Sequence, residues 1–248
     1  MIHRLKVYYE WLCVYLDEAS KLKAKRPELY DPSGLALDFP RWMYGHRQKA
    51  SSIEDKLPWI SFSAIAFFKK ILTNDMKIFE YGSGGSTLFF AGRAARVFSV
   101  EHDRSWYNNV QQAVHRCGYN NSRVMLAAAE KPSGAFNDDP SDPSGYASSD
   151  DNFKGMSFEN YVKKIDEFDD GYFDIVIVDG RSRPACAKRA MKKVKTGGYL
   201  VIDNSERDTY KKASDLFNSP DWQLRLFSGP SPYMFHFSET SFWKKIKE

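Results

Sequence analysis

The chain has 248 residues, and its 36 basic and 32 acidic side chains leave a formal net charge of +4. This length allows one domain with a sizeable hydrophobic core, and the modest charge neither requires nor excludes an acidic partner such as a nucleic acid. The three cysteines, Cys13, Cys117 and Cys186, have neither disulfide nor zinc-ligand spacing, which predicts a reduced, cytoplasmic protein.

The N-terminal part, residues 1–57, is predicted to be a helical extension of a domain formed by residues 58–248. Apolar residues recur at helical spacing from Ile2 to Leu22, which predicts an amphipathic helix. Charged residues are mixed into this stretch, so the sequence predicts no membrane span. The helix either packs on the domain or covers its cofactor cleft, or it contacts a membrane surface or a partner. Pro27 and Pro32 then predict a loop.

The stretch from Lys77 to Phe90 predicts a strand, a glycine-rich turn and a helix that begins near Ser86. Glycines in the turn have no Cβ, so the chain can bend sharply and present bare backbone amides to a ligand. A second predicted strand ends at Glu101, 19 residues after Gly82, where an acid is expected to accept hydrogen bonds from ribose hydroxyls. This order of elements predicts a nucleoside-binding βαβ unit.

The acidic residue Glu80 narrows the choice of ligand. In dinucleotide-binding strands this position is normally apolar, and a carboxylate there would repel a pyrophosphate but favour a cation. The order Glu80-x-Gly82-x-Gly84 resembles the first motif of the class I S-adenosylmethionine-dependent methyltransferases, with Ser86 in place of the usual third glycine. A serine at a helix start is a normal cap.

The resemblance covers approximately residues 58–245 and implies S-adenosylmethionine as the cofactor. The residues assigned to cofactor binding are Glu80, Gly82, Ser83, Gly84, Gly85, Ser86, Thr87, Glu101, His102 and Asp179.

Later apolar runs complete the predicted fold. Three further strands are expected at 122–130, 172–179 and 197–203, with helices at 105–117 and 184–194 between them. The runs 222–227 and 240–243 have no helix between them, which fits the antiparallel final strands of the methyltransferase fold. The predicted class is α/β, a Rossmann-like, mostly parallel seven-stranded sheet with helices on both faces and an antiparallel C-terminal strand pair.

Two other segments are candidate borders of the substrate site. Residues 131–152 are rich in Pro, Gly, Ser and Asp, and this insertion is either a mobile lid over the acceptor or a plain surface insertion. Residues 40–46 form an aromatic and basic stretch that could lie beside the same site.

Polar residues follow the fourth and fifth predicted strands, where chemistry is expected in this fold. Asp179, Asp203 and Asn204 are similar to the set found in the catechol O-methyltransferase type, and this similarity implies a divalent cation such as magnesium. Three roles for Asp179 are open: a metal ligand, a cofactor contact or general base, or a helix cap. Arg181 and Arg183 either grip an anionic acceptor or form surface salt bridges. The lysine expected after Asp179 in that type is absent.

The sequence therefore predicts in-line methyl transfer from S-adenosylmethionine to an oxygen of a small-molecule or glycan-like acceptor. Asp179 and Arg181 are the predicted catalytic residues, and the histidines considered as alternative bases are His102, His46 and His236. The alternatives are an NAD-dependent oxidoreductase and a non-catalytic nucleotide or cofactor-sensing module. No base-amine methylation motif or nucleic-acid module is present, so nucleic acid is not the predicted partner, and the pattern predicts no oligomeric state.

Overall fold

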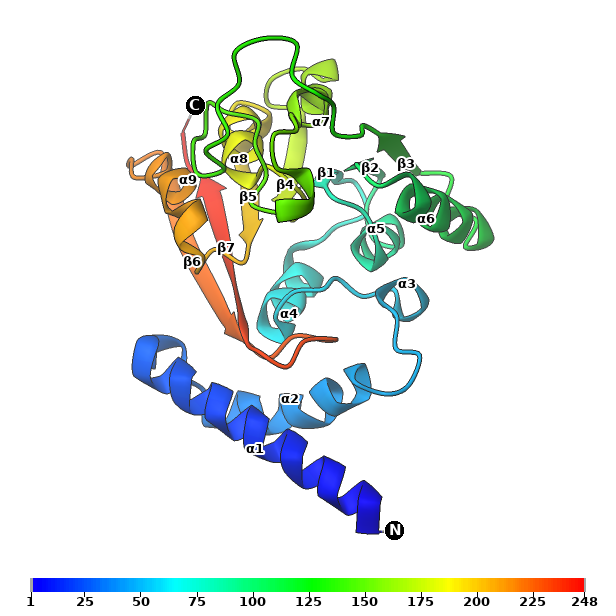
Figure 1. Ribbon diagram of the computed structural model, residues 1–248, viewed down its shortest axis with the longest axis vertical. Coiled ribbons are helices and arrows are strands. Elements are labelled where there is room, and N and C mark those ends of the chain that lie inside the picture. The colour runs from blue at the N-terminus through cyan, green and yellow to red at the C-terminus, as the bar shows by residue number, and fades with distance from the viewer. Residues whose placement is uncertain (1, 248) are drawn as a thin grey trace.

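The computed structural model describes residues 2–247 and contains a seven-stranded sheet in the order β3-β2-β1-β4-β5-β7-β6 (Figure 1). Strands β1 to β5 pair in parallel, whereas β7 lies antiparallel to both β5 and β6. This arrangement confirms the predicted fold class, including the antiparallel C-terminal pair. The strands are β1 Lys77–Tyr81, β2 Arg96–Glu101, β3 Ser122–Leu126, β4 Phe173–Val178, β5 Val194–Asp203, β6 Trp222–Gly229 and β7 Ser238–Lys245.

Helices cover both faces of the sheet, and the alternation of side chains along β1 shows how. Phe79 and Tyr81 belong to a buried cluster with residues of the helices that follow β3, β4 and β5. Ile78 belongs to a second cluster on the other face. Because successive side chains of a strand point to opposite faces, Glu80 lies on the same face as Ile78. The helices concerned are α4 Phe62–Ile71, α5 Gly85–Ala91, α6 Arg104–Arg116, α7 Glu159–Lys163, α8 Arg183–Ala190 and α9 Lys211–Asp215.

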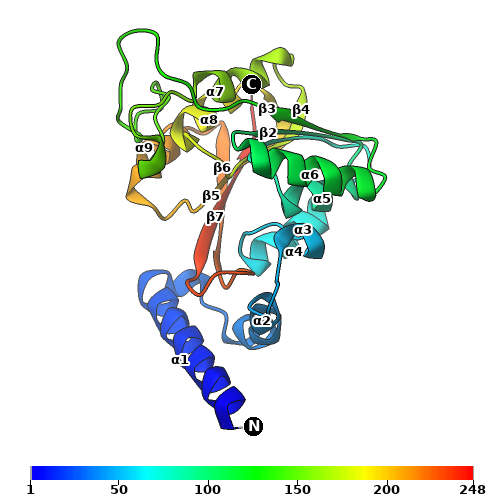
Figure 2. The ribbon, with the colours of Figure 1, turned by 45° about the vertical axis from the view of Figure 1, so that its right-hand side comes forward.

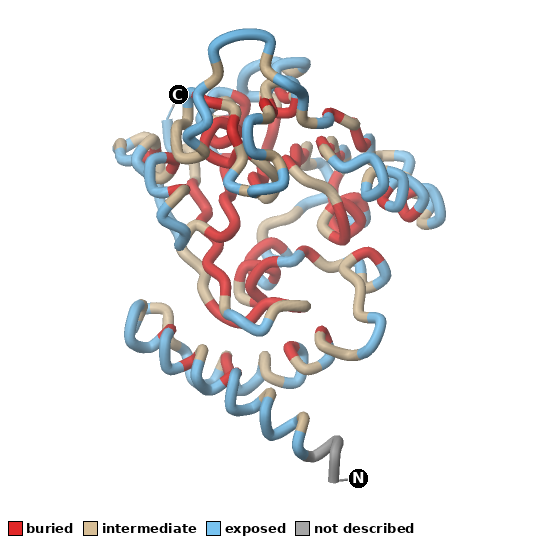
Figure 3. Tube along the Cα trace, viewed as in Figure 1, coloured by how far each residue is buried: buried red, intermediate tan, exposed pale blue. Residues whose placement is uncertain are grey.

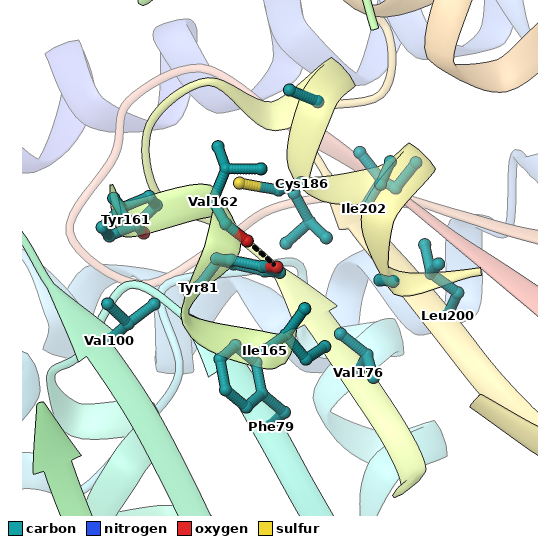
Figure 4. Close-up of a cluster of buried hydrophobic side chains, with 14 of the residues drawn as sticks. Phe79, Tyr81, Val100, Tyr161, Val162, Ile165, Val176, Cys186, Leu200 and Ile202 are labelled. Carbon is teal, nitrogen blue, oxygen red and sulfur yellow. Dashed lines mark hydrogen bonds between the residues drawn. The ribbon is translucent and has the colours of Figure 1, made fainter. Parts of the chain in front are cut away.

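The first of these clusters includes a buried polar contact (Figure 4). The hydroxyl of Tyr81 donates a hydrogen bond to the carbonyl oxygen of Val162 in α7, with 2.8 Å between the oxygens. This bond ties the last residue of β1 to the layer of helices above it. The end of β1, where the glycine-rich turn begins, is therefore held against α7.

Two predicted boundaries miss the observed ones by four residues. Strand β3 ends at Leu126, and Glu130 instead forms an isolated antiparallel bridge with Ser157. Helix α8 ends at Ala190, not at Val194, because β5 already begins at Val194 and the chain must turn before it. Lys192 and Lys193, which the predicted range 184–194 included in the helix, therefore lie in the turn.

Helices α1 Ile2–Lys25, α2 Pro32–Gly45 and α3 Ser52–Asp55 precede the sheet. The predicted helix from Ile2 is confirmed and is one turn longer than expected, but the predicted loop at Pro32 is wrong. Proline suits the first turn of a helix, and the Asp31 carboxylate caps α2 by accepting a hydrogen bond from the Ser33 N–H. Figures 1 and 2 show α1 and α2 at one end of the molecule, with the N-terminal half of α1 directed away from the sheet.

Contacts join these helices to the connection between β6 and β7. The indole of Trp42 is completely buried and donates a hydrogen bond to the carbonyl oxygen of Met234 at 2.8 Å. Tyr15 of α1 packs edge-on against both Trp42 and Phe237. Packing on the domain is one of the roles expected for the first helix. The division of the chain at residue 57 stays a prediction. Across residues 2–247, no helix is long and apolar enough to cross a membrane.

The insertion at 131–152 contains no helix or strand until a short 3₁₀ turn begins at Asp151, and half of its residues are exposed (Figure 3). Two ion pairs tether it: Lys212 to Asp139 at 3.1 Å and Arg181 to Asp150 at 2.9 Å. The second of these pairs lies at the edge of the large cavity described below. Its role as a lid stays a prediction.

Candidate functional site

A cavity of about 730 Å³ opens at the carboxyl ends of the parallel strands. It gathers residues that are far apart in the sequence: the turn after β1, the end of β2, and the segments after β4 and β5. Of the residues assigned to cofactor binding, catalysis or a metal, Thr87 alone does not line it. Those that do are Glu80, Gly82, Ser83, Gly84, Gly85, Ser86, Glu101, His102, Asp179, Arg181, Asp203 and Asn204.

The Glu80 carboxylate lies at the base of this cavity and is only 2% exposed. Its Oε2 accepts hydrogen bonds from the hydroxyls of Thr87, at 2.7 Å, and Ser99, at 2.6 Å. Burial raises the pKa of Glu80 to about 7, although hydrogen bonds from these hydroxyls and from Ser86 act in the opposite direction. Near neutral pH this group is therefore poised between its neutral and charged forms, and a cation nearby would favour the charged form.

The glycine-rich turn depends on the absence of side chains. Gly82 has a φ of +104°, which L-residues with a Cβ rarely adopt. A Cβ on Gly85 would overlap the carbonyl oxygens of Ser52 and Leu57. Backbone atoms of Ser52 and Leu57, which precede the sheet in the chain, thus pack directly against the turn.

The expected cap of helix α5 is wrong. The helix begins at Gly85 with Gly84 as its N-cap, and Ser86 lies inside its first turn. The Thr87 hydroxyl accepts a hydrogen bond from the Gly84 N–H at 3.1 Å. Ser86 is turned toward Glu80 instead, and this explains why a serine is accommodated where the motif usually has a glycine.

The Glu101 carboxylate at the end of β2 is held by three hydrogen bonds. Its Oε1 accepts from the backbone N–H groups of His102 and Asp103, at 2.8 and 2.9 Å, and its Oε2 accepts from the Ser83 hydroxyl at 2.9 Å. Burial alone would raise the pKa of Glu101, but these bonds and the neighbouring His102 lower it below its ordinary value. The cavity therefore presents an ionised, fixed acceptor to any ligand hydroxyl.

A guanidinium group occupies the centre of the acidic cluster after β4 and β5. Arg183 lies 3.0 Å from the Asp179 carboxylate and 3.9 Å from that of Asp203, and it donates to the Asn204 side-chain oxygen at 3.3 Å. Burial raises the pKa of Asp203 well above its ordinary range, and Asp179 contributes in the same direction.

The oxygens of Asp179, Asp203 and Asn204, which were proposed as magnesium ligands, face the Arg183 guanidinium. The residues present therefore do not fit a divalent metal ion. Within residues 2–247 no group of three or more His, Cys, Asp and Glu side chains could hold a metal ion. The divalent cation implied by the catechol O-methyltransferase resemblance is not supported. Arg183 supplies the positive charge at this position.

Arg181 stands at the rim of the cavity beside His102. It pairs with Asp150 at 2.9 Å, and its Nε donates to the His102 ring at 3.3 Å. His46 packs between the rings of Trp42 and Phe235 and does not line the cavity, nor does His236. Among the histidines considered as alternative bases, only His102 is at the site.

The expectation that residues 40–46 border the site is wrong for this cavity, because none of them lines it: residues 40–45 belong to α2, whose Trp42 is buried, and His46 caps that helix. Met234, from the connection on which Trp42 packs, lines the cavity instead.

Several lining residues were not predicted. Trp106 in the first turn of α6 donates an indole hydrogen bond to the Ser83 carbonyl oxygen at 2.7 Å. Its place three residues after the Asp103 cap was a usable signal, since the first turn of α6 starts beside Glu101. Trp59, Phe153 and Arg207 had no such signal, because only the tertiary fold brings them to the cavity.

No protein-family model and no curated protein matches the sequence. Solved structures do match the fold. A candidate O-methyltransferase from Klebsiella pneumoniae aligns with a TM-score of 0.55 at 12% identity, over 96% of this chain and 100% of that chain. A cofactor-bound protein from MTB aligns with a TM-score of 0.54 at 13% identity, over 92% of this chain and 96% of that chain. An rRNA methylase from Streptococcus thermophilus aligns with a TM-score of 0.52 at 12% identity, over 75% and 95%.

Proposed function

We propose that this chain, which has the fold of the class I S-adenosylmethionine-dependent methyltransferases, methylates an oxygen of a small-molecule or glycan-like acceptor. One observation carries the proposal: the buried Glu80 carboxylate lies in the same cavity as the glycine-rich turn and Glu101. Because the activity of an enzyme resides in its site, these residues support the proposal more directly than the fold does.

The cavity fits S-adenosylmethionine in size and in chemistry. Its volume of about 730 Å³ is within the range of about 300–1,000 Å³ typical of small-molecule pockets. Glu101 would accept hydrogen bonds from the ribose hydroxyls, and the amides of the turn after β1 would hold the carboxylate end of the ligand. Glu80 would favour the positively charged part. When bound, this cofactor supplies a methyl group made electrophilic by a sulfonium.

The acceptor side of the cavity contains a candidate base. The Asp179 side chain is 30% exposed, so a substrate hydroxyl can reach it, and burial raises its pKa even though Arg183 acts to lower it. A raised pKa lies closer to neutral pH, and a general base works best when its pKa is near the pH at which the enzyme operates. Asp179 would take the hydroxyl proton, while Arg183 holds the carboxylate in position.

The two rival functions make different demands on the site. A nicotinamide-dependent oxidoreductase would bring a pyrophosphate to the turn beside Glu80, where an ionised carboxylate repels it. A sensor would bind the cofactor without turnover.

The rRNA methylase neighbour keeps RNA among the acceptors to be assayed. We also place the protein in the cytoplasm, since Cys13, Cys117 and Cys186 are free.

The decisive experiment is calorimetric titration of the purified protein with S-adenosylmethionine, S-adenosylhomocysteine and NAD. We expect binding of the first two and none of NAD. Glu80→Gln should weaken S-adenosylmethionine binding, whereas Glu54→Gln, at an exposed residue of α3, should not. Affinity for NAD alone would overturn the proposal.

Turnover is then assayed on phenols, sugars and RNA, with and without a metal chelator. Transfer to a hydroxyl that is unchanged by chelator is the expected result. Tight cofactor binding with no transfer to any acceptor would favour the sensor.

A further inference from the structure

A second cavity, of about 230 Å³, adjoins the large one on the side of Asp179 and Arg183. Both cavities are lined by Asp150, Gly180, Arg181, Arg183 and Arg207, so a single ligand can extend from one into the other. Neither Glu80 nor Glu101 lines the second cavity. It therefore lies beyond the part of the site proposed for the nucleoside.

The lining of this cavity is positively charged. Three guanidinium groups, those of Arg181, Arg183 and Arg207, face one carboxylate, that of Asp150. Arg181 is paired with Asp150, and Arg183 is engaged by Asp179 and Asp203. The side chain of Arg207 is exposed, and no salt bridge to it is present among residues 2–247. Within the described part of the chain, Arg207 is thus the one guanidinium of this cavity without a salt bridge, although Asp179 and Glu206 are close enough for its charge to act on the pKa of each.

Its remaining polar groups also favour an anion. The hydroxyls of Ser149 and Tyr210 lie 3.5 Å apart at the cavity wall and share one hydrogen bond, which leaves one of the two O–H groups free to donate to a ligand. Helix α8, eight residues long, begins at this wall, and no side chain caps its first turn. The unpaired amides at a helix start attract negative charge.

A neutral sugar would satisfy the hydroxyls but not the unpaired guanidinium. An anionic oxygen group satisfies both, because arginine binds carboxylate and phosphate through two parallel hydrogen bonds.

We propose that the second cavity binds an anionic group of the methyl acceptor, a carboxylate or a phosphate, with Arg207 as its principal partner. This inference rests on the proposed function only in naming the ligand as the methyl acceptor. The acceptor would thus be an acidic small molecule or an acidic sugar, anchored at Arg207 with its hydroxyl directed toward Asp179.

The test is a titration of the full chain, without cofactor, with inorganic phosphate and with acetate, and with glucose as the uncharged control. Binding is followed by NMR through the Nε–H signals of the arginines. We expect the Arg207 signal to shift in a saturable manner with at least one anion and not with glucose. The anion that binds more tightly identifies the acceptor group as phosphate or carboxylate.

Variants assign the binding to Arg207, with affinity followed through the remaining arginine signals. Arg207→Ala should weaken anion binding at least about tenfold, since a hydrogen bond between charged groups is lost. Arg207→Lys should be intermediate, because the charge is kept but the paired geometry is not. Arg123→Ala is the matched control: Arg123 is also exposed, lies on β3 outside both cavities, and should leave affinity unchanged.

Two results would overturn the anion site: no saturable shift with either anion, or equal affinity in Arg207→Ala and the native chain. S-adenosylmethionine binding is measured on the same samples. A chain that binds the anion but not the cofactor refutes the methyltransferase proposal and leaves the anion site standing. A chain that binds the cofactor but neither anion refutes only the anion site.

Discussion

Glu80 and Ser99 lie directly opposite each other on the adjacent parallel strands β1 and β2, and the Ser99 hydroxyl donates to the Glu80 carboxylate at 2.6 Å. This pair lies on the face of the sheet that α4 and α5 cover, where most neighbours are apolar. A buried carboxylate supported only by neutral hydroxyls favours its protonated form. The site therefore contains a group whose charge depends on what binds beside it.

Folding stability should fall as pH rises because of Glu80. Its pKa is raised from 4.5 to about 7 in the folded chain, so the stabilisation is complete below pH 4.5 and is lost as pH rises to 7. The loss amounts to about 3 kcal/mol in the free energy of unfolding. Glu80→Gln should remove this component, and urea denaturation at about pH 5 and pH 8 measures it. Equal pH dependence in Glu80→Gln and the native chain would contradict the assignment, with Glu54→Gln as the control.

Affinity for S-adenosylmethionine should show the opposite dependence on pH. A cationic ligand is stabilised by the ionised carboxylate, and the ionised fraction of Glu80 rises as pH passes about 7. We expect affinity to increase up to about tenfold between pH 6 and pH 8. Calorimetry on the native chain and on Glu80→Gln, in buffers of both pH values, measures the difference. A native chain whose affinity is flat over this range would show that Glu80 does not sense the cofactor charge.

The turn after β1 should tolerate no side chain at Gly85. A methyl group there would overlap the carbonyl oxygens of Ser52 and Leu57, and both are backbone atoms that cannot simply rotate away. Gly85→Ala should lower the free energy of unfolding by about 1–3 kcal/mol, the usual cost of overpacking, and should also weaken cofactor binding. Gly134→Ala, where the added methyl meets nothing within 4 Å, is the matched control. Denaturation curves that coincide for these two variants would contradict the close packing.

Much of this fold could be predicted from local patterns. Strand β4 is buried along its whole length, and its uninterrupted apolar run identified it. The turn after β1 was identified because a sharp bend needs glycine at a position such as Gly82, with its φ of +104°. Strand β5 was harder: it begins at Val194, before its glycines, and its pairing with β4 shifts register between Phe173 and Ile175. Such an irregularity has no local signature.

The acceptor side of the site could be predicted only in part. Asp179, Asp203 and Asn204 were identified because they follow strands, and the structure does bring them together. Their contact with Arg183 was not predicted. The sequence shows that carboxylates follow the strands, but it does not show whether a metal ion or a guanidinium group lies among their oxygens. Trp59 reaches the cavity from the segment before α4 and Met234 from the connection between β6 and β7, and only the completed fold brings these two segments together.

Removing the Arg183 charge should destabilise the chain strongly. The guanidinium is buried between Asp179 and Asp203, and its loss leaves both carboxylates without a cation. Arg183→Ala should lower the free energy of unfolding by about 3–5 kcal/mol. The exposed pair between Arg189 and Asp166 provides the control, since Arg189→Ala should cost at most about 1 kcal/mol. Equal losses in the two variants, measured by urea denaturation, would show that Arg183 does not hold the cluster together.

Asp179→Asn should distinguish a general base from a cofactor contact and from a purely structural partner of Arg183. As a general base, Asp179 is expected to raise the rate about 10²–10⁴-fold, so the variant should lose that factor in kcat while binding S-adenosylmethionine as before. The native rate should rise with pH as Asp179 ionises, and this rise should begin above the ordinary range of an aspartate because burial raises its pKa. Asp166→Asn, at an exposed ion pair, is the control. Loss of cofactor affinity in Asp179→Asn would identify a cofactor contact. An unchanged kcat together with lower stability would identify Asp179 as a structural partner of Arg183.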